Sequence, residues 1–519
     1  MQKIFYDTRM LDKAARDAYG LTEDIMMENA SAALEREGSS HFFSPDNKYI
    51  NRPCVLILAG GGNNGADGYA LARRIVQHKI DVAVCQVYEP KSDICVLQAE
   101  RAKKAGVIFI NPYDLDDFIE RASFDLTVVY DCIFGSGFHG TLDAMTTAVI
   151  ESANKIDTAY KIACDIPTGA NQDCSQGQNA AAFRADTTVT MGALKLTLYS
   201  DTAKDACGKI IVADLGVSRS NFESAMQAQN SAAILPCAEL LEESDARLPL
   251  RGKKQNSNKG TYGHTAIFAG TKPGAAVIAG HAALKFGSGL ASLVPIAEQK
   301  INFENVADFE LMVADTVPQN ATALVAGPGL GRPDDFGLAS NCPQNQETAA
   351  STVCGLASVP QPLVLDADIF YWPQIKDLLA AKKNVVLTPH PKEFAALLKN
   401  LGMGDYTVAQ VVARRFELVQ EFCRAYTDCV LVLKGSNVLI ASKLQGEQEP
   451  RVYINALGTS ALAKGGSGDV LAGMTAALLA QGYLPLEAAV TASIAHASAS
   501  HAFDGKDYAL TPFELMEAL

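Results

Sequence analysis

Near the carboxyl end, the run Gly465-Gly466-Ser467-Gly468-Asp469 places glycines and one carboxylate at the expected start of an apolar helix. Such glycines let several backbone N–H groups point at one spot, where they stabilise a phosphoryl group. A carboxylate just inside the helix can take the proton of a hydroxyl as phosphate is transferred to it. The run therefore predicts a phosphoryl-transfer site with Asp469 as the base. It is not a Walker A loop, and an ordinary glycine-rich helix start would also favour an acidic first turn.

A second glycine-rich turn, Gly60–Gly68, follows the apolar run Val55–Ala59 and precedes a helical pattern. It satisfies G-x-G-x-x-G, the spacing that places phosphate at a helix N-terminus, although close chain packing also uses such turns. Asp81 is poorly placed to bind a ribose, because it opens the next strand rather than closing it. The two asparagines and the aspartate inside the turn add oxygen ligands, which favours a binding site.

Two further strands of the first half end in aspartates, Asp131 and Asp165. Because the carboxyl ends of parallel strands converge on one crevice, we expect Asn64 and Thr168 to share a site with both aspartates. Hard oxygen ligands of low total charge suit a monovalent or divalent cation. Each aspartate taken singly is more simply explained as a helix or turn cap, whereas the ordered set favours a ligand site.

A histidine and a lysine end two strands of the second half. Prolines flank His390, and they predict a rigid loop that turns its imidazole toward the crevice, available for a hydrogen bond. A single histidine is otherwise more often a core or surface residue. Lys434 follows the strand Val430–Leu433, where its charge can meet a polyphosphate.

Short apolar runs show which strands must position these residues. The runs are continuous rather than alternating, which is typical of strands covered on both faces in a parallel α/β sheet. Helical patterns lie between them, for example over residues 66–78 and 144–154. The runs are Val55–Leu58, Val82–Val84, Val107–Ile110, Leu126–Val129, Ile162–Cys164 and Thr188–Thr190, then Thr265–Phe268, Ala323–Ala326, Leu363–Leu365, Val385–Leu387 and Val430–Leu433.

The strand and helix rhythm breaks between about residues 215 and 258, where Ser, Asn, Gln and charged residues dominate. We place the junction near residue 222, which predicts one domain over 1–222 and another over 223–519. A chain of 519 residues suits two large domains, because single cores stop growing at ~250–300 residues. No internal repeat relates the halves, so we expect two different α/β domains.

Composition excludes several classes of protein. The formal charge of -14 excludes a generic phosphate-backbone binder, so a nucleotide should sit in a pocket. A hydrophobic fraction of 48% excludes disorder over most of the length. We see neither an apolar leader nor a run near the ~18 residues that span a bilayer. The 12 cysteines form no C-x-x-C pair, which favours free thiols in a reducing cytoplasm. We therefore expect a cytoplasmic protein without nucleic-acid or membrane partners.

The first 220 residues or so resemble the NAD(P)H-hydrate epimerase domain, which implies a Rossmann-like three-layer α/β fold. The motifs that carry the resemblance are Thr8–Asp12, Met27–Ala30, Asn63–Gly68, Asp131–Gly137, Asp165–Gly169 and Ala185–Thr190. Ala66 stands where that family commonly has glycine, a small change that should be tolerated.

The resemblance also implies site residues for a damaged nicotinamide nucleotide. The substrate contacts it implies are Asn63, Asn64, Gly65, Ala66, Asp67, Gly135, Ser136, Gly137, Phe138, His139, Gly140, Thr141 and Asp165. It implies potassium at Asn64, Asp131 and Thr168. Epimerisation needs proton transfer, and a buried carboxylate can provide it if its pKa is raised. Asp165 is our candidate acid and base, with His139 and Lys195 as weaker ones.

Residues 225–519 resemble the NAD(P)H-hydrate dehydratase, a branch of the ribokinase-like superfamily. The motifs are Lys259–His264, Ala326–Gly331, Leu365–Asp368, Leu387–Glu393, Val432–Gly435 and Asn455–Gly473. The implied contacts to the hydrate are Ala275, Gly329, His390 and Asp469, and those to the nucleotide are Lys434, Gly435, Ser436, Asn437, Val438 and Gly468. Lys272-Pro273 replaces the start of the family's Tyr-x-Gly-Ala loop, which leaves the aromatic stacking partner without a counterpart.

Together these resemblances imply a bifunctional repair enzyme for hydrated NADH and NADPH. One domain would equilibrate the R and S hydrates, and the other would use ADP to dehydrate the S hydrate, releasing AMP and phosphate. ADP is implied by the bacterial two-domain form, Mg²⁺ is expected wherever such phosphates transfer, and we expect a homo-oligomer.

Three alternatives stay open at this point. A ribokinase-like small-molecule kinase fused to a non-catalytic nucleotide-binding scaffold would share the Gly-Ser-Gly-Asp motif. An NAD-dependent dehydrogenase would need a second Rossmann feature, and we find none. A wholly non-catalytic scaffold predicts that neither Asp165 nor Asp469 matters for function.

Overall fold

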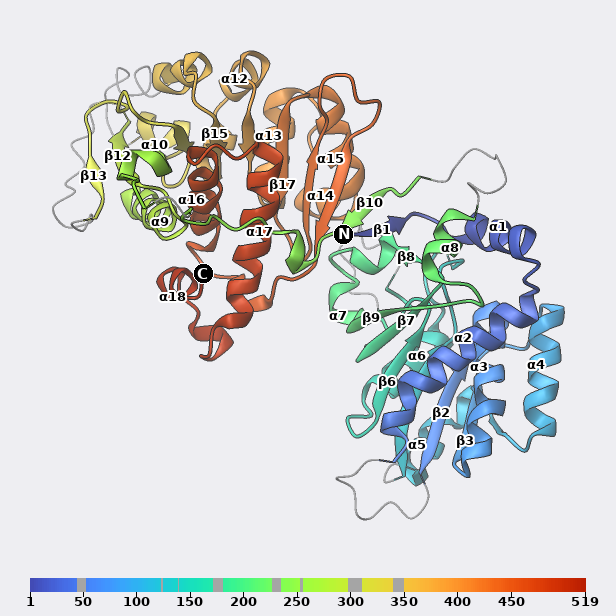
Figure 1. Cartoon of the computed structure of the whole chain (residues 1–519). Helices are drawn as coiled ribbons and strands as arrows, with labels where there is room; N and C mark the ends of the chain where they lie inside the picture. The colour runs from blue at the N-terminus through green and yellow to red at the C-terminus, as the bar shows by residue number, and fades with distance from the viewer. Residues whose placement is uncertain are drawn as a thin grey trace. The chain divides into compact units, whose positions relative to one another are not determined.

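The structure is a computed structural model with two compact units, each described separately (Figure 1). One unit spans Lys3–Ala238, and the other comprises Glu239–Leu519 with Met1–Gln2. The sequence placed the junction near residue 222, which lies inside helix α8 (Arg219–Ser224), and the extent of the two functional domains stays a prediction. The structure describes residues 1–43, 53–122, 125–138, 140–170, 181–225, 235–252, 255–296, 310–338 and 350–519.

The first unit is built on a seven-stranded sheet of order β4-β3-β2-β5-β6-β7-β9 in which every neighbouring pair is parallel. A short parallel pair of strands is formed by β1 (Gln2–Phe5) and β8 (Leu194–Lys195). The sheet strands are β2 (Cys54–Ala59), β3 (Asp81–Gln86), β4 (Ile108–Ile110), β5 (Leu126–Cys132), β6 (Tyr160–Cys164), β7 (Thr187–Met191) and β9 (Lys209–Ala213).

Helices cover both faces of this sheet because the side chains of each strand alternate between them. Val55 and Ile57 of β2 pack with one set of helices, whereas Leu56 and Leu58 pack with the other. The first set is α2 (Glu23–Gly38), α3 (Asn63–Ile75) and α4 (Asp93–Lys104), and the second is α5 (Leu115–Ala122) and α6 (Ala144–Asn154). The remaining helices are α1 (Arg9–Tyr19), α7 (Lys204–Cys207) and α8. The predicted three-layer α/β architecture is confirmed.

The second unit has a sheet of order β13-β12-β11-β14-β15-β16-β17-β18-β19-β10. The pairs are parallel as far as β17, and β18 runs antiparallel to both its neighbours. The strands are β10 (Ala238–Leu240), β11 (His264–Ala269), β12 (Leu290–Pro295), β13 (Met312–Val313), β14 (Ala323–Ala326), β15 (Leu363–Leu365), β16 (Val385–Leu387), β17 (Cys429–Leu433), β18 (Val438–Ser442) and β19 (Arg451–Asn455).

The largest core cluster of this unit joins the sheet to three helices rich in alanine, whose small side chains allow close packing. These helices are α9 (Pro273–Lys285), α16 (Ser467–Ala480) and α17 (Pro485–Ala502). The others are α10 (Pro333–Leu338), α12 (Ile375–Ala381), α13 (Pro391–Leu401), α14 (Val408–Ala413), α15 (Arg415–Ala425) and α18 (Pro512–Glu517). Within the described ranges, no helix is long and apolar enough to cross a membrane.

Candidate functional site

The turn after β2 and the ends of β5 and β6 lie at one edge of the first sheet. Leu58 pairs with Asp131, and Asp131 pairs with Ala163, two residues before Asp165. A Cβ on Gly65 would collide with the carbonyl oxygen of Gly60, so this turn requires glycine there. The register confirms the expectation that these chain segments converge.

Asp165 lies at the centre of this edge and is only 7% exposed. Its carboxylate contacts Lys195 Nζ at 2.6 Å and accepts a hydrogen bond from the Ser136 N–H at 2.9 Å. Burial alone would raise the pKa of Asp165, but the charge and hydrogen bond of Lys195 lower it below its ordinary value. The condition set for Asp165 as proton donor, a raised pKa, is therefore not met, because a buried lysine holds it ionised.

Two neighbouring carboxyl groups behave in the opposite way. Burial, with the charge of Asp165, raises the pKa of Asp67 well above its usual value. Burial also raises the pKa of Asp12 to about 6, although Lys195 opposes it. Asp12 comes from α1 and had no predicted role; the only signal for it was its place in the Thr8–Asp12 motif. Within the predicted set, Asp67 thus differs from Asp165 in the direction in which its pKa is shifted.

The proposed potassium ligands are tied together by the segment after β5. Asp131 is fully buried and accepts hydrogen bonds from the Thr168 N–H at 2.6 Å and the Thr168 hydroxyl at 2.8 Å. The Phe134 N–H donates to Thr168 Oγ1 at 3.1 Å, and a Cβ on Gly135 would lie 3.3 Å from Asn64 Oδ1.

These residues fit a monovalent cation. Burial raises the pKa of Asp131 to about 6, and among the described residues no cationic side chain forms an ion pair with it. A cation would supply the positive charge that this buried oxygen cluster lacks.

The remaining predicted residues of the first unit are less closely grouped. Phe138 stacks on Phe134 with ring centroids 4.3 Å apart, and Asn63 accepts a 3.5 Å hydrogen bond from the Ser92 hydroxyl. Gly140 and Thr141 are exposed, Gly137 has open space around it, and Ala66 is buried in the core. His139 lies outside the described residues.

In the second unit, Lys434 is the centre of a buried charge cluster. Its Nζ lies 2.8 Å from Asp366 Oδ1 and 3.8 Å from Glu393 Oε2. Burial lowers the pKa of Lys434, but Asp366 and Glu393 raise it above its ordinary value. Asp366 and Glu393 follow strand ends, yet nothing in the sequence identified them as the partners of this lysine.

Asp469 occupies the first turn of α16 beside this cluster. Gly466 at the helix cap has φ 92°, and a Cβ there would lie 2.5 Å from Pro512 Cγ, so the cap requires glycine. A Cβ on Gly468 would lie 3.1 Å from Lys434 Nζ, which places the helix start against the lysine. Burial and the charge of Asp366 raise the pKa of Asp469 to about 7. A carboxylate with that pKa can accept a proton at neutral pH.

The sequence left the imidazole of His390 available for a hydrogen bond, whereas in the structure both ring nitrogens have local partners. Its Nδ1 accepts hydrogen bonds from the N–H groups of Lys392 and Glu393 at 3.1 and 3.3 Å, and so caps α13. Its Nε2 contacts Glu393 Oε1 at 3.1 Å, and the side chain is 45% exposed. Both ring nitrogens are used in the first helical turn, because Glu393 completes a capping box with His390.

Other predicted residues of the second unit fall into two groups. Gly329 has φ 61°, and a Cβ there would collide with the carbonyl oxygen of Lys272 and lie 3.2 Å from Ala275 Cβ, so Gly329 and Ala275 are neighbours. The turn between β17 and β18 holds the others. There Gly435 and Ser436 are exposed, Asn437 is buried, and Val438 opens β18.

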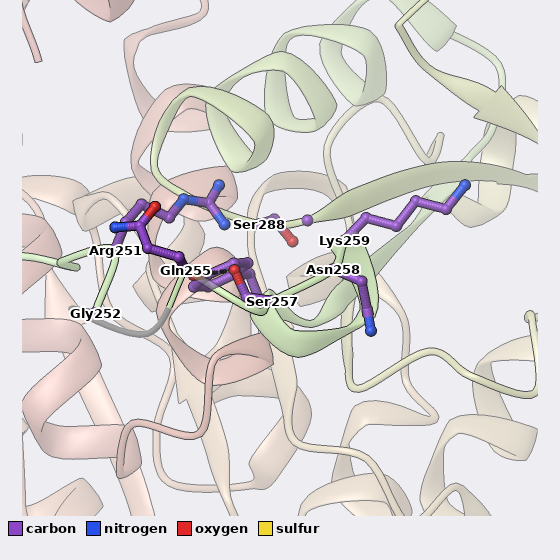
Figure 2. A pocket seen from close by; sticks show the side chains of 9 residues that line it. Arg251, Gly252, Gln255, Ser257, Asn258, Lys259 and Ser288 are labelled. Atoms are coloured by element: carbon purple, nitrogen blue, oxygen red, sulfur yellow. Dashed lines mark hydrogen bonds between the residues drawn. The ribbon is translucent and has the colours of Figure 1, made fainter.

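A cavity of about 480 Å³ lies apart from these residues (Figure 2). Arg251 lies over the Tyr262 ring, 3.7 Å from its centroid, while the Lys259 side chain extends away from Arg251 (Figure 2). None of the predicted site residues lines it, and the charged groups do not converge. Its lining residues are Arg251, Gly252, Gln255, Ser257, Asn258, Lys259, Tyr262, Ser288 and Gly289.

Two family models match the chain. Residues 23–197 match the YjeF-related protein N-terminus, and residues 265–519 match NAD(P)H-hydrate dehydratase. The bifunctional NAD(P)H-hydrate repair enzyme of Helicobacter pylori is 41% identical over 521 residues, covering 100% of this chain and 99% of that protein. The enzyme of the same name from Coxiella burnetii is 30% identical, covering 82% of this chain and 81% of its own.

Among solved structures, the second unit is similar to an ADP/ATP-dependent NAD(P)H-hydrate dehydratase from Bacillus subtilis co-crystallised with ATP and Mg²⁺. The two are 26% identical with a TM-score of 0.42, over 54% of this chain and 96% of that chain.

Proposed function

The chain belongs to the family of bifunctional NAD(P)H-hydrate repair enzymes, and we propose from this that it restores hydrated NADH and NADPH in two linked steps. The first unit epimerises the R and S hydrates, and the second dehydrates the S hydrate with ADP. The observation that carries this function is the full-length similarity, in which both units are matched together. It supports the repair enzyme over a small-molecule kinase fused to a scaffold.

In the second unit, Asp469 takes the proton of the hydrate's ring hydroxyl as the hydroxyl oxygen attacks the β-phosphorus of ADP. AMP leaves with the electrons of the broken P–O bond. The ring phosphate then leaves with a proton from the adjacent ring carbon, which restores the double bond. This proposal is supported by the pKa of Asp469, about 7, and by the N–H groups of Gly468 and Asp469 in the first turn of α16, which have no intrahelical partner.

Lys434 supports the nucleotide in this proposal, with Gly435, Ser436, Asn437, Val438 and Gly468 around it. Hydrate contacts are assigned to Ala275, Gly329, His390 and Asp469. Within the described part of the chain, no group of three acidic, cysteine or histidine side chains could hold a metal. Mg²⁺ therefore fits best as an ion carried by the phosphates of ADP, whose charge it neutralises.

In the first unit, we assign the proton-carrying role to Asp67 and the role of charged partner to Asp165. The pKa of Asp67 is raised well above its usual value by burial, whereas Lys195 holds Asp165 ionised. Asn64, Asp131 and Thr168 would hold potassium, which supplies positive charge near the nucleotide. The proposal also includes a cytoplasmic location and a homo-oligomer, on the sequence arguments alone.

One assay tests the whole function. A mixture of R and S NADH hydrate is incubated with the full chain and with ADP or ATP in parallel, and absorbance of the dihydronicotinamide ring is followed. Complete recovery with ADP is expected, because the epimerase activity feeds the R form into dehydration. Recovery of the S fraction alone would contradict the epimerase activity, and no recovery with either nucleotide would contradict the dehydratase activity.

A further inference from the structure

Helix α17 contributes a buried histidine to the start of α16. His496 is 8% exposed, and its Nε2 lies 2.9 Å from the carbonyl oxygen of Ser467 and 3.1 Å from Ser467 Oγ. Ser467 is the first residue of α16 and lies between Gly466 and Gly468. The proposed reaction assigns no role to this contact, and no motif of the sequence indicated it.

The contact with the carbonyl determines which ring nitrogen carries the hydrogen. A carbonyl oxygen only accepts, so Nε2 must be the donor. Burial lowers the pKa of His496 to about 4, so the ring is neutral at pH 7 and has a single N–H. Ser467 Oγ, close to the same N–H, then accepts as well. The hydroxyl hydrogen of Ser467 is not consumed by this contact.

Among residues 466–468, Ser467 alone has a side chain, and both its hydroxyl and its carbonyl oxygen contact His496. The glycines on either side have none, and their backbones pack directly against Pro512 and Lys434. The first N–H groups of a helix have no intrahelical partner and point along the axis, so their direction follows the backbone of these residues. A rigid hold on Ser467 therefore fixes the direction of the N–H groups at Gly468 and Asp469.

We propose that His496 is a positioning residue for phosphoryl transfer, which holds the α16 start through Ser467 so that its N–H groups meet the arriving phosphate. His496 acts through Ser467 and does not contact the substrate. This inference rests on the proposed function of the α16 start as a phosphate site. A shift of ~1 Å in such groups can cost about 100-fold in rate, so the hold matters for kcat more than for binding.

Two substitutions in the full chain test it. His496→Phe keeps the ring volume and removes the N–H, whereas His496→Gln returns an amide N–H near the position of Nε2. We expect His496→Phe to lower kcat of ADP-dependent dehydration by about 10- to 100-fold with little change in the KM of the hydrate. His496→Gln should recover most of kcat. Epimerisation and the unfolding midpoint, followed by the fluorescence of Trp372, serve as controls on folding.

The outcomes separate the inference from the function beneath it. If the wild type is active, two results would overturn the positioning role. One is an unchanged kcat in a folded His496→Phe variant, and the other is an equal loss of kcat in His496→Phe and His496→Gln. A wild type without dehydration would instead overturn the proposed function. If His496→Phe does not fold, ¹⁵N NMR of the wild type decides. A neutral ring with its hydrogen on Nε2 between about pH 5 and 8 supports the role, and a hydrogen on Nδ1 overturns it.

Discussion

Each unit has a lysine beside aspartates, buried in the first unit and half-buried in the second, and the two lysines form different ion pairs. In the first unit, Lys195 contacts Asp165, the central aspartate of the site, at 2.6 Å. In the second, Lys434 forms its ion pair with Asp366 at 2.8 Å, and its charge lowers the pKa of Asp469 only in part. The pKa of Asp165 is lowered as a result, whereas burial and Asp366 raise that of Asp469 to about 7.

This difference teaches that the lysine's partner, rather than burial, decides which carboxyl group can exchange a proton. Burial is the largest influence on both aspartates and acts in the same direction. In the proposed reaction, the proton acceptor of the second unit is Asp469, which is not the ion-pair partner of the lysine. The same reasoning led us to propose Asp67, rather than Asp165, as the proton carrier of the first unit.

Of the variants that test this comparison, Asp469→Asn should have the largest effect, because it removes the base and keeps the shape of the side chain. The rate of ADP-dependent dehydration should fall by a factor on the order of 10²–10⁴. Epimerisation, measured by chromatographic separation of the two hydrates, should continue, because its residues lie in the other unit. Asp377→Asn, an exposed aspartate on α12, is the matched control. Loss of both activities in a folded variant would contradict separate sites.

The variant with the next largest expected effect removes the ion pair between Lys195 and Asp165 in the first unit. Lys195→Met leaves Asp165 buried and charged without its cation, which should lower the free energy of unfolding of this unit by about 3–5 kcal/mol. Hydrogen exchange of the β6 and β7 amides measures this change. Asp165→Asn should leave only the S hydrate consumed.

A double variant sharpens that result. Asp165→Asn combined with Lys195→Met leaves no unpaired charge, so it should be more stable than Lys195→Met alone. If the double variant and Lys195→Met were equally stable, the loss of Lys195 would not leave an uncompensated buried charge on Asp165. Unchanged use of the R hydrate in Asp165→Asn would remove Asp165 from the epimerase site.

The strands that carry both sites could be predicted because they are continuous apolar runs. The eleven predicted runs all fall within or overlap observed strands, and the turn after β2 lies where its glycines indicated. Strand β12 was missed because Ala, Ser and Pro interrupt its apolar pattern. The hairpin of β18 and β19 was missed as well, since charged and polar residues occur at its edges.

The residues of the sites could be named from motifs, but their pairings could not. Lys434 and Asp366 stand 68 positions apart, and only the parallel register of β15, β16 and β17 brings them together. The flanking prolines predicted a rigid loop that leaves the imidazole of His390 available for a hydrogen bond, and the local partners of the ring were not foreseen. The capping signal was Glu393, three residues later, which in this chain holds the ring in the helix start.

The pH dependence of the dehydration rate tests whether Asp469 is the base. A base works only when deprotonated, so the dehydration rate should fall about tenfold per pH unit below its pKa of about 7. The effect on stability has the opposite sign. A carboxyl group with a raised folded-state pKa favours folding below its unfolded pKa, and this contribution is lost as pH rises toward 7. Asp469→Asn should therefore raise the unfolding midpoint at pH 8 and change it little at pH 4, as read from Trp372 fluorescence.

The smallest effect concerns His390, whose ring nitrogens contact groups in the first turn of its own helix. His390→Ala should lower the free energy of unfolding by about 1 kcal/mol, because α13 loses its cap. His390→Asn should lose less, since an asparagine oxygen can accept the same N–H groups. Denaturant unfolding measures both. A hydrate contact at His390 would add a rise in the KM of the hydrate that is similar in the two variants. If the KM stays constant in both variants, His390 caps α13 and does not contact the hydrate. Proton transfer in the second unit would then depend on Asp469 and not on the imidazole.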